Sequence, residues 1–77
     1  GDAGMYLEYF GNLERLIEIV DGDITSKVAI DSRKQVLSAI ESYRLDFEED
    51  GVDKHRIEEL VNSCQEDLKD YGAYENN

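Results

Sequence analysis

The chain of 77 residues contains no proline and no tryptophan, and Cys64 is its only cysteine. A single cysteine cannot form an intramolecular disulfide, which excludes the cross-linked scaffolds of many small secreted domains. A lone thiol is typical of a reducing compartment, so we predict a cytoplasmic protein. The length allows one small domain, whose limited core would gain stability from a partner or a second copy.

Long apolar runs are also absent. No run approaches the roughly 18 residues that a membrane-spanning helix needs, and no basic-then-apolar leader is present, so we predict neither a membrane span nor a signal peptide. Met5 follows the short sequence GDAG. We interpret residues 1–4 as a remnant of an expression vector, residues 5–72 as a single helical domain and residues 73–77 as a flexible tail.

Basic residues are scarce. Eight lysines and arginines stand against 19 acidic side chains, for a formal net charge of −11, and residues 46–77 hold 11 of the acidic residues but only 3 of the basic ones. An anionic surface repels nucleic acid and anionic lipid, so we predict that the protein binds neither directly. Such a surface favours a basic protein partner, or it only keeps a small protein soluble.

Three segments have helical periodicity, near residues 5–20, 25–49 and 53–71. Asp53 is predicted to cap the third segment, and Gly72 suits the left-handed position that ends many helices. The pattern predicts an all-α fold, a small antiparallel three-helix bundle. The predicted apolar faces comprise Met5, Tyr6, Tyr9, Phe10, Leu13, Leu16, Ile17 and Val20 in the first segment, Ala29, Ile30, Val36, Leu37, Ile40, Tyr43 and Phe47 in the second, and Ile57, Leu60, Val61, Cys64, Leu68 and Tyr71 in the third.

The second segment is the longest of the three. A helix of its 25 residues would be roughly 37 Å long, so we expect it either to break near Asp31–Ser32 or to project beyond the other two. Arg33 and Arg44 fall on or near its apolar face. We expect their stems to lie along that face and their guanidinium groups to meet carboxylates of another helix, with partner binding as the alternative.

The twelve residues from Asp21 to Ser32, DGDITSKVAIDS, place aspartates at alternate positions, as calcium-binding loops do. An EF-hand loop also requires a glycine at its sixth position and a bidentate glutamate at its twelfth. Ser26 and Ser32 occupy those two positions, so the loop lacks the turn residue and two carboxylate oxygens. We therefore predict a turn in which Asp23 or Thr25 caps the following helix.

Two residues with catalytic potential lie on opposite sides of the third predicted helix. Cys64 is on its apolar stripe, where a thiol behaves as a small hydrophobe, and His55 is a surface residue without a companion metal ligand. Pairs of carboxylates need a cleft that separates their pKa values, and a bundle of this size has little room for one. We predict no enzyme activity, no metal and no cofactor.

An acidic ridge is the first candidate for a binding surface. We predict that it docks on a basic protein, so that the chain acts as an inhibitor, immunity protein or adaptor with a regulatory role. A nuclease inhibitor that presents carboxylates where phosphates would bind is one concrete form. The predicted residues are Asp46, Glu48, Glu49, Asp50, Glu59, Glu66 and Asp70.

The aromatic end of the first segment is the second candidate, with Tyr6, Tyr9 and Phe10 close together. Tyrosine and phenylalanine are common interface anchors. Leu7 and Ile19 lie outside the apolar face and add to this possible surface. The alternative prediction is thus a structural or assembly protein that forms a homodimeric bundle through its first helix. If Phe10 is ordinary core instead, its replacement should unfold the monomer.

Overall fold

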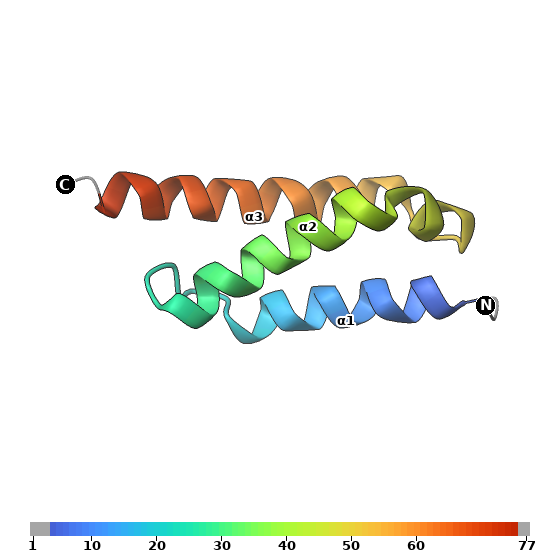
Figure 1. The fold of residues 1–77 in the computed structure, drawn as a ribbon, viewed down its shortest axis with the longest axis horizontal. Coiled ribbons are helices and arrows are strands. Elements are labelled where there is room, and N and C mark those ends of the chain that lie inside the picture. Colours follow the sequence, from blue (N-terminus) through green and yellow to red (C-terminus); the bar gives the residue numbers. More distant parts are fainter. Residues whose placement is uncertain (1–3, 76–77) are drawn as a thin grey trace.

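The computed structural model describes residues 4–75, and it contains three helices joined by two short turns (Figure 1). They are α1 (Met5–Ile19), α2 (Lys27–Glu49) and α3 (Lys54–Glu75). The helix α2 runs antiparallel to the other two and packs against both, in a molecule that measures 46 × 18 × 17 Å. The predicted all-α three-helix bundle is confirmed. Within the described range, none of the helices has the length and apolar character to cross a membrane.

The turn between α1 and α2 contains the aspartates that resemble calcium ligands. Asp23 Oδ1 accepts hydrogen bonds from the backbone N–H groups of Thr25 (3.1 Å) and Ser26 (3.0 Å). Hydrogen bonds from the side chain and backbone of Ser26, and then from Thr25, lower the pKa of Asp23. Ser26 Oγ in turn accepts the N–H of Ala29 (3.1 Å). The cap of α2 is therefore Ser26 rather than Asp23 or Thr25, and the helix begins two residues later than predicted.

The turn between α2 and α3 closes the end of α2 by two backbone hydrogen bonds. Val52 N–H donates to the carbonyl of Phe47 (2.9 Å) and Gly51 N–H donates to that of Glu48 (3.0 Å). This pattern requires a left-handed residue, and Gly51 supplies it with φ of 98°. Asp53 Oδ1 then accepts the N–H of His55 (2.7 Å), so the predicted cap of α3 is confirmed.

The predicted end of the third helix at Gly72 is wrong, and the break near Asp31–Ser32, one of two alternatives for the second helix, does not occur. The helix α2 is continuous through Asp31–Ser32 and is kinked at Tyr43 instead, where φ is −123° and ψ is 17°. The helix α3 passes through Gly72 and continues to Glu75, because this glycine does not adopt the left-handed conformation that would end it. Of the predicted tail, residues 73–75 thus belong to α3. Residues 76–77, and residues 1–3 of the predicted vector remnant, lie outside the described residues.

The core lies where the predicted apolar faces of the three helices meet. Met5 (49% exposed) and Tyr43 (39% exposed) are the most exposed of the predicted members. Leu7 and Ile19 are exposed, as expected from their positions outside the face of α1. The buried cluster comprises Phe10, Leu13, Val36, Ala39, Ile40, Phe47, Val52, Ile57, Leu60 and Cys64.

An aromatic cluster fills the end of the core nearest the α2–α3 turn. Phe47 is fully buried at its centre, and the ring centroid of Phe10 lies 5.3 Å from that of Phe47 in an edge-to-face arrangement. Tyr6 and Tyr9 contact Phe47 from α1, with centroids at 6.0 and 5.6 Å. Phe10 itself has no exposed surface. The prediction that Phe10 contributes to an oligomer face is therefore wrong, because its own chain covers it completely.

Cys64 is also fully buried, and burial raises the pKa of its thiol from 9.0 to about 11. Between these pH values the unfolded chain releases the proton while the folded chain retains it. The free energy of unfolding should therefore fall as the pH rises from about 9 to about 11. Urea titrations of the protein and of Cys64→Ala, at about pH 7 and about pH 10, check this prediction. The unaltered protein should lose more stability than the variant, and equal losses would contradict it.

Candidate protein-binding groove

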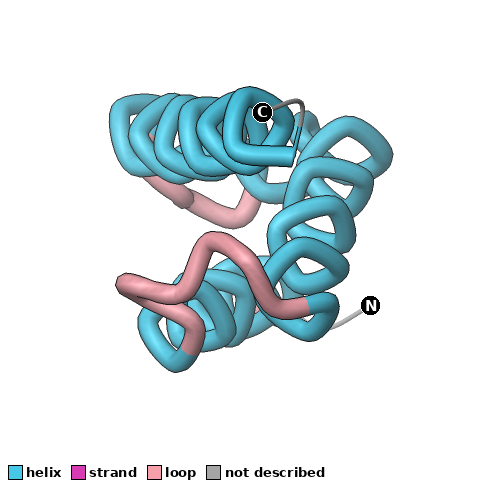
Figure 2. The backbone as a smooth tube through the Cα atoms, turned by 90° about the vertical axis from the view of Figure 1, so that its left-hand side faces the viewer, coloured by secondary structure: helices cyan, strands magenta, loops and turns pink. Residues whose placement is uncertain are grey.

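A groove runs between α1 and α3 on the side away from α2. Figure 2 looks along the helices and shows α2 on one side of both α1 and α3, with no helix of residues 4–75 on the opposite side. The groove has a volume of about 400 Å³. Its lining residues are Glu14, Ile17, Glu18 and Asp21 from α1 and the turn after it, and Arg56, Glu59, Leu60 and Ser63 from α3.

The floor of the groove is apolar. Leu60 belongs to the buried core with 8% of its surface exposed, and Ile17 packs against that core while remaining partly exposed. Ile17 and Glu18 follow Glu14 by three and four residues, and Asp21 in the turn follows them by four and three, so the four residues lie along one side of α1 and its end. They cover about 10 Å, or two helical turns.

One end of the groove is closed by an ion pair between the helices. The Arg56 guanidinium on α3 donates two hydrogen bonds to the Glu14 carboxylate on α1, one of them from Nε to Oε2 at 3.2 Å. The same guanidinium lies 5.3 Å from the centroid of the Phe10 ring. The hydrogen bond to Glu14 raises the pKa of Arg56. This bidentate contact neutralises Glu14, so that carboxylate contributes little to the field of the groove.

The remaining carboxylates of the groove lack a lysine or arginine counter-charge among the described ion pairs. The side chains of Glu18 and Asp21 form no hydrogen bond or ion pair with another described residue, and Glu59 contacts only the exposed imidazole of His55 (2.7 Å). An imidazole carries a charge only when it is protonated. The rims therefore present uncompensated negative charge on both sides of an apolar floor, which is an arrangement suited to a cationic ligand.

The predicted acidic ridge does not form one continuous face. Glu59 lines the groove, whereas Glu66 and Asp70 lie exposed farther along α3. The other four predicted residues lie at the end of α2, beside the beginning of α3 (Figure 1). From Lys54 to Asp70 the rise along α3 alone is about 24 Å. The two ends of the predicted ridge are thus separated by more than half the length of the molecule.

Two of the predicted acidic residues at the end of α2 have partners within the chain. Asp50 Oδ2 accepts the backbone N–H of Tyr6 (2.8 Å), and so supplies the side-chain cap that Gly4, the N-cap residue of α1, does not provide. Glu48 contacts Arg44 (3.4 Å) and Lys54 (4.0 Å). Asp46 is half-buried and Glu49 is exposed. Asp46 is also the main cause of the raised pKa of Tyr6.

Three groove residues, Glu14, Glu18 and Asp21, are not among the predicted site residues, whereas Glu59 is. Their only signal in the sequence is the spacing of these carboxylates around Ile17, and Ile17 itself lies on the predicted apolar face. The spacing does not reveal that α3 stands opposite these residues. The groove therefore becomes visible only when the two helices are placed together.

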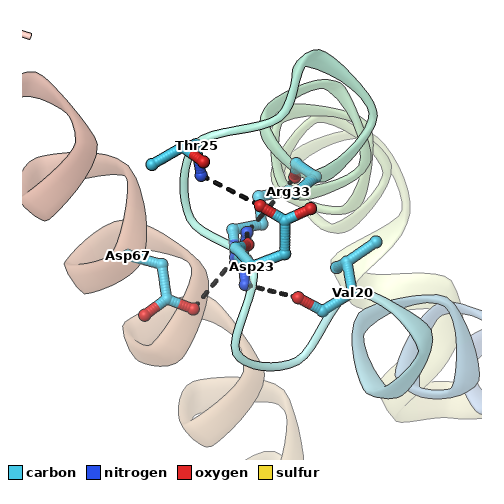
Figure 3. A network of polar contacts seen from close by, with 6 residues as sticks. Val20, Asp23, Thr25, Arg33 and Asp67 are labelled. Carbon is cyan, nitrogen blue, oxygen red and sulfur yellow. Dashed lines mark hydrogen bonds and ion pairs between the residues drawn. The ribbon is translucent and has the colours of Figure 1, made fainter.

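Beyond the open end of the groove, Arg33 is buried with 2% of its surface exposed (Figure 3). Its Nε donates to Asp67 Oδ2 on α3 (2.9 Å), Nη1 donates to the carbonyl of Asp23 (2.6 Å) and Nη2 to that of Val20 (3.2 Å). The predicted contact with a carboxylate of another helix is confirmed. Because the guanidinium is enclosed, Arg33 holds the α1–α2 turn against α3 and is not available to a partner.

Arg44 confirms the same expectation in a more exposed setting. Its Nε contacts Glu48 of the same helix (3.4 Å), and its Nη2 lies 3.8 Å from Glu58 of α3. Such partly exposed pairs add little stability individually. The contact nevertheless occupies the guanidinium with carboxylates of its own chain.

The described residues contain no group of three histidine, cysteine, aspartate or glutamate side chains placed to hold a metal ion. The Cys64 thiol is buried, and its raised pKa keeps it protonated at neutral pH. What the groove can do chemically is attract and hold positive charge next to an apolar surface. Comparison of the chain with protein-family models, curated proteins and solved structures yields no match.

Proposed function

We propose that this protein is an acidic protein–protein interaction module that docks on a basic partner surface through the α1–α3 groove. The observation that carries the proposal is the set of carboxylates without a lysine or arginine partner, Glu18, Asp21 and Glu59, on both rims of an apolar floor. Structural carboxylates in this chain, such as Asp67 and Asp50, are hydrogen-bonded internally. Glu18 and Asp21 have no such internal partner among the described residues, and Glu59 contacts only the imidazole of His55.

The mechanism of docking combines two ranges of interaction. The net charge of −11 steers a basic partner towards the protein and raises the association rate at low salt. The apolar floor at Ile17 and Leu60 then contributes short-range affinity that salt does not screen. A partner held in this way has its own basic surface covered, which is how an inhibitor, an immunity protein or an adaptor would act.

Charge reversal at the groove tests the proposal. The double variant Glu18→Lys/Glu59→Lys changes the net charge from −11 to −7, and Glu49→Lys/Glu66→Lys changes it equally at exposed positions outside the groove. We expect the groove variant to bind a basic partner at least about tenfold more weakly, because two attractions become repulsions. The matched variant should bind within about twofold of the unaltered protein.

The measurement is affinity capture from native lysate with each of the three proteins, eluted in steps of rising salt. A basic protein released from the unaltered chain and the matched variant, but not retained by the groove variant, is the expected result. An equal loss of binding in both variants would show that binding depends on the net charge of the protein and not on the groove. Capture of nothing but the chain itself, resistant to salt, would contradict docking on a basic partner.

That last outcome would favour the second candidate function, a homodimeric assembly. Tyr6 and Tyr9 of α1 are only partly buried, and the ring of Tyr43 on α2, 39% exposed, lies 5.7 and 5.9 Å from theirs. A patch of three tyrosines that spans two helices could anchor a second copy. Sedimentation equilibrium of the protein and of Tyr43→Ser checks this candidate: a dimer that the substitution dissociates would support it.

A further inference from the structure

We infer that the occupant of the α1–α3 groove is a basic amphipathic helix of the partner protein, which lies along α1 and α3 as a fourth helix of the bundle. The inference rests on the proposed function and names the chemistry of its partner. It is carried by the shape of the groove, by the order of apolar and charged groups across it, and by the difference in charge between its two ends.

The shape of the groove suits a helix. Two helices that run in the same direction bound it, and the side away from α2 carries no helix (Figures 1 and 2). The residues from Glu14 to Asp21 span about 10 Å, which matches two turns of a ligand helix with anchors at positions i, i+4 and i+7. The volume of about 400 Å³ is enough for a few side chains. A row of side chains from one helix fills such a groove in ordinary helix packing.

The order of groups across the groove is carboxylate, apolar floor, carboxylate. Glu18 and Asp21 form one rim and Glu59 forms the other, with Ile17 and Leu60 between them. The complementary ligand has a narrow apolar stripe with lysine or arginine on both sides of it. A helix with apolar residues at spacings of three and four, and basic residues at the flanking positions, presents this order along its whole length.

Other peptide conformations fit less well. An extended segment binds by adding a strand to a sheet edge, but both walls of the groove are α-helices whose backbone groups are already paired. A proline-rich segment binds to aromatic side chains, and the residues that line the groove include none. A bound helix needs neither free backbone groups nor aromatic rings in the groove. Of these three modes of peptide binding, it is therefore the one that the groove fits.

The uneven charge along the groove gives the ligand helix a direction. Arg56 and Glu14 neutralise each other at one end, whereas Glu18 and Asp21 lie at the other end without a counter-charge among the described residues. A helix carries partial positive charge at its N-terminus and partial negative charge at its C-terminus. The ligand therefore places its C-terminal end near Arg56 and its N-terminal end near Asp21. It runs antiparallel to α1 and α3, which completes an up-down-up-down bundle.

The test uses two synthetic peptides of identical composition and charge. One places leucines along a single helical stripe flanked by lysine and arginine, and the other distributes the same residues so that no stripe forms. Each is titrated into the whole isotope-labelled protein at low salt, and the backbone amide shifts report where it binds. We expect the striped peptide to bind at least about tenfold more tightly, to perturb Ile17, Glu59 and Leu60, and to become helical.

The protein variants provide the control. Glu18→Lys/Glu59→Lys should weaken binding of the striped peptide by at least about tenfold, and Glu49→Lys/Glu66→Lys by no more than about twofold. A spin label at the C-terminus of the striped peptide should broaden the signals of Glu14 and Arg56 more than that of Asp21. Broadening of Asp21 instead would overturn the direction.

The other outcomes separate this inference from the proposed function. Equal binding of both peptides in the groove would overturn the helical occupant and leave electrostatic docking intact. Shifts confined to the end of α2, at Asp46 to Asp50, would overturn the groove as the site while an acidic docking surface remained. No binding of either peptide at low salt would overturn both.

Discussion

Replacing Arg33 with alanine should lower the free energy of unfolding by about 3 kcal/mol or more. Arg33 is the largest fully buried side chain, and its guanidinium is hydrogen-bonded to the carbonyls of Val20 and Asp23 as well as to Asp67. Its removal leaves a void in the core, and the carbonyl of Asp23 loses the hydrogen-bond donor that Arg33 provides. A domain of this size is stable by about 4 to 12 kcal/mol, so the loss is a large fraction of the total.

Urea unfolding, followed by circular dichroism, measures this effect. Arg33→Lys is the informative control, because it keeps the charge but has only one nitrogen, whereas the guanidinium contacts three separate acceptors through Nε, Nη1 and Nη2. We expect it to lose more than 1 kcal/mol, or about tenfold in the folding equilibrium, yet less than Arg33→Ala. A lysine variant as stable as the unaltered protein would show that charge alone, and not the geometry of the guanidinium, is required at this position.

Replacing Phe47 with alanine should cost about 3 to 5 kcal/mol, the second large effect. Phe47 has no exposed surface and stands among four aromatic rings, of which Phe10 and Tyr9 are the nearest with centroids at 5.3 and 5.6 Å. Both α1 and the end of α2 pack around this ring. Since α1 contributes the neighbouring rings, the variant should also weaken the attachment of α1 to α2.

Leu45→Ala provides the matched control. It lies two residues before Phe47 on the same helix, but 73% of its surface is exposed, so the same truncation should change the free energy of unfolding by no more than about 0.5 kcal/mol. Thermal unfolding of both variants gives the comparison. A loss at Leu45 as large as that at Phe47 would mean that Leu45 is covered in solution, for instance by a second copy of the chain.

These two residues differ in how well the sequence predicts them. Phe47 lies on the helical apolar stripe, and periodicity alone places it in the core. Arg33 lies at the edge of the same stripe, and its position correctly indicates a contact with a carboxylate of another helix. Neither the identity of that carboxylate nor the backbone carbonyls follow from the pattern, because they depend on how the α1–α2 turn folds against α3.

The candidate site was predicted only in part, and the reason is similar. Net charge makes the carboxylates the candidate binding groups, but it does not show which of them are already paired within the chain. Asp50 is bound to Tyr6, and Glu14 to Arg56, in each case across more than 40 residues of sequence. Helical spacing cannot predict such pairs, because it identifies only neighbours within one helix. The spacing of Glu18 and Asp21 did not predict a site for the same reason, because Glu59, on the opposite rim of the groove, belongs to α3.

By itself the sequence determined the number and type of the helices, their apolar faces and the cap at Asp53. These features depend on residues a few positions apart, and local periodicity and backbone hydrogen bonding are sufficient to predict them. Only the tertiary structure decided the kink at Tyr43, the burial of Arg33 and the groove between α1 and α3. Each of these features depends on which side chains meet when the helices pack. Whether a charged group is paired, or an apolar side chain is buried, is decided by its neighbours on the other helices.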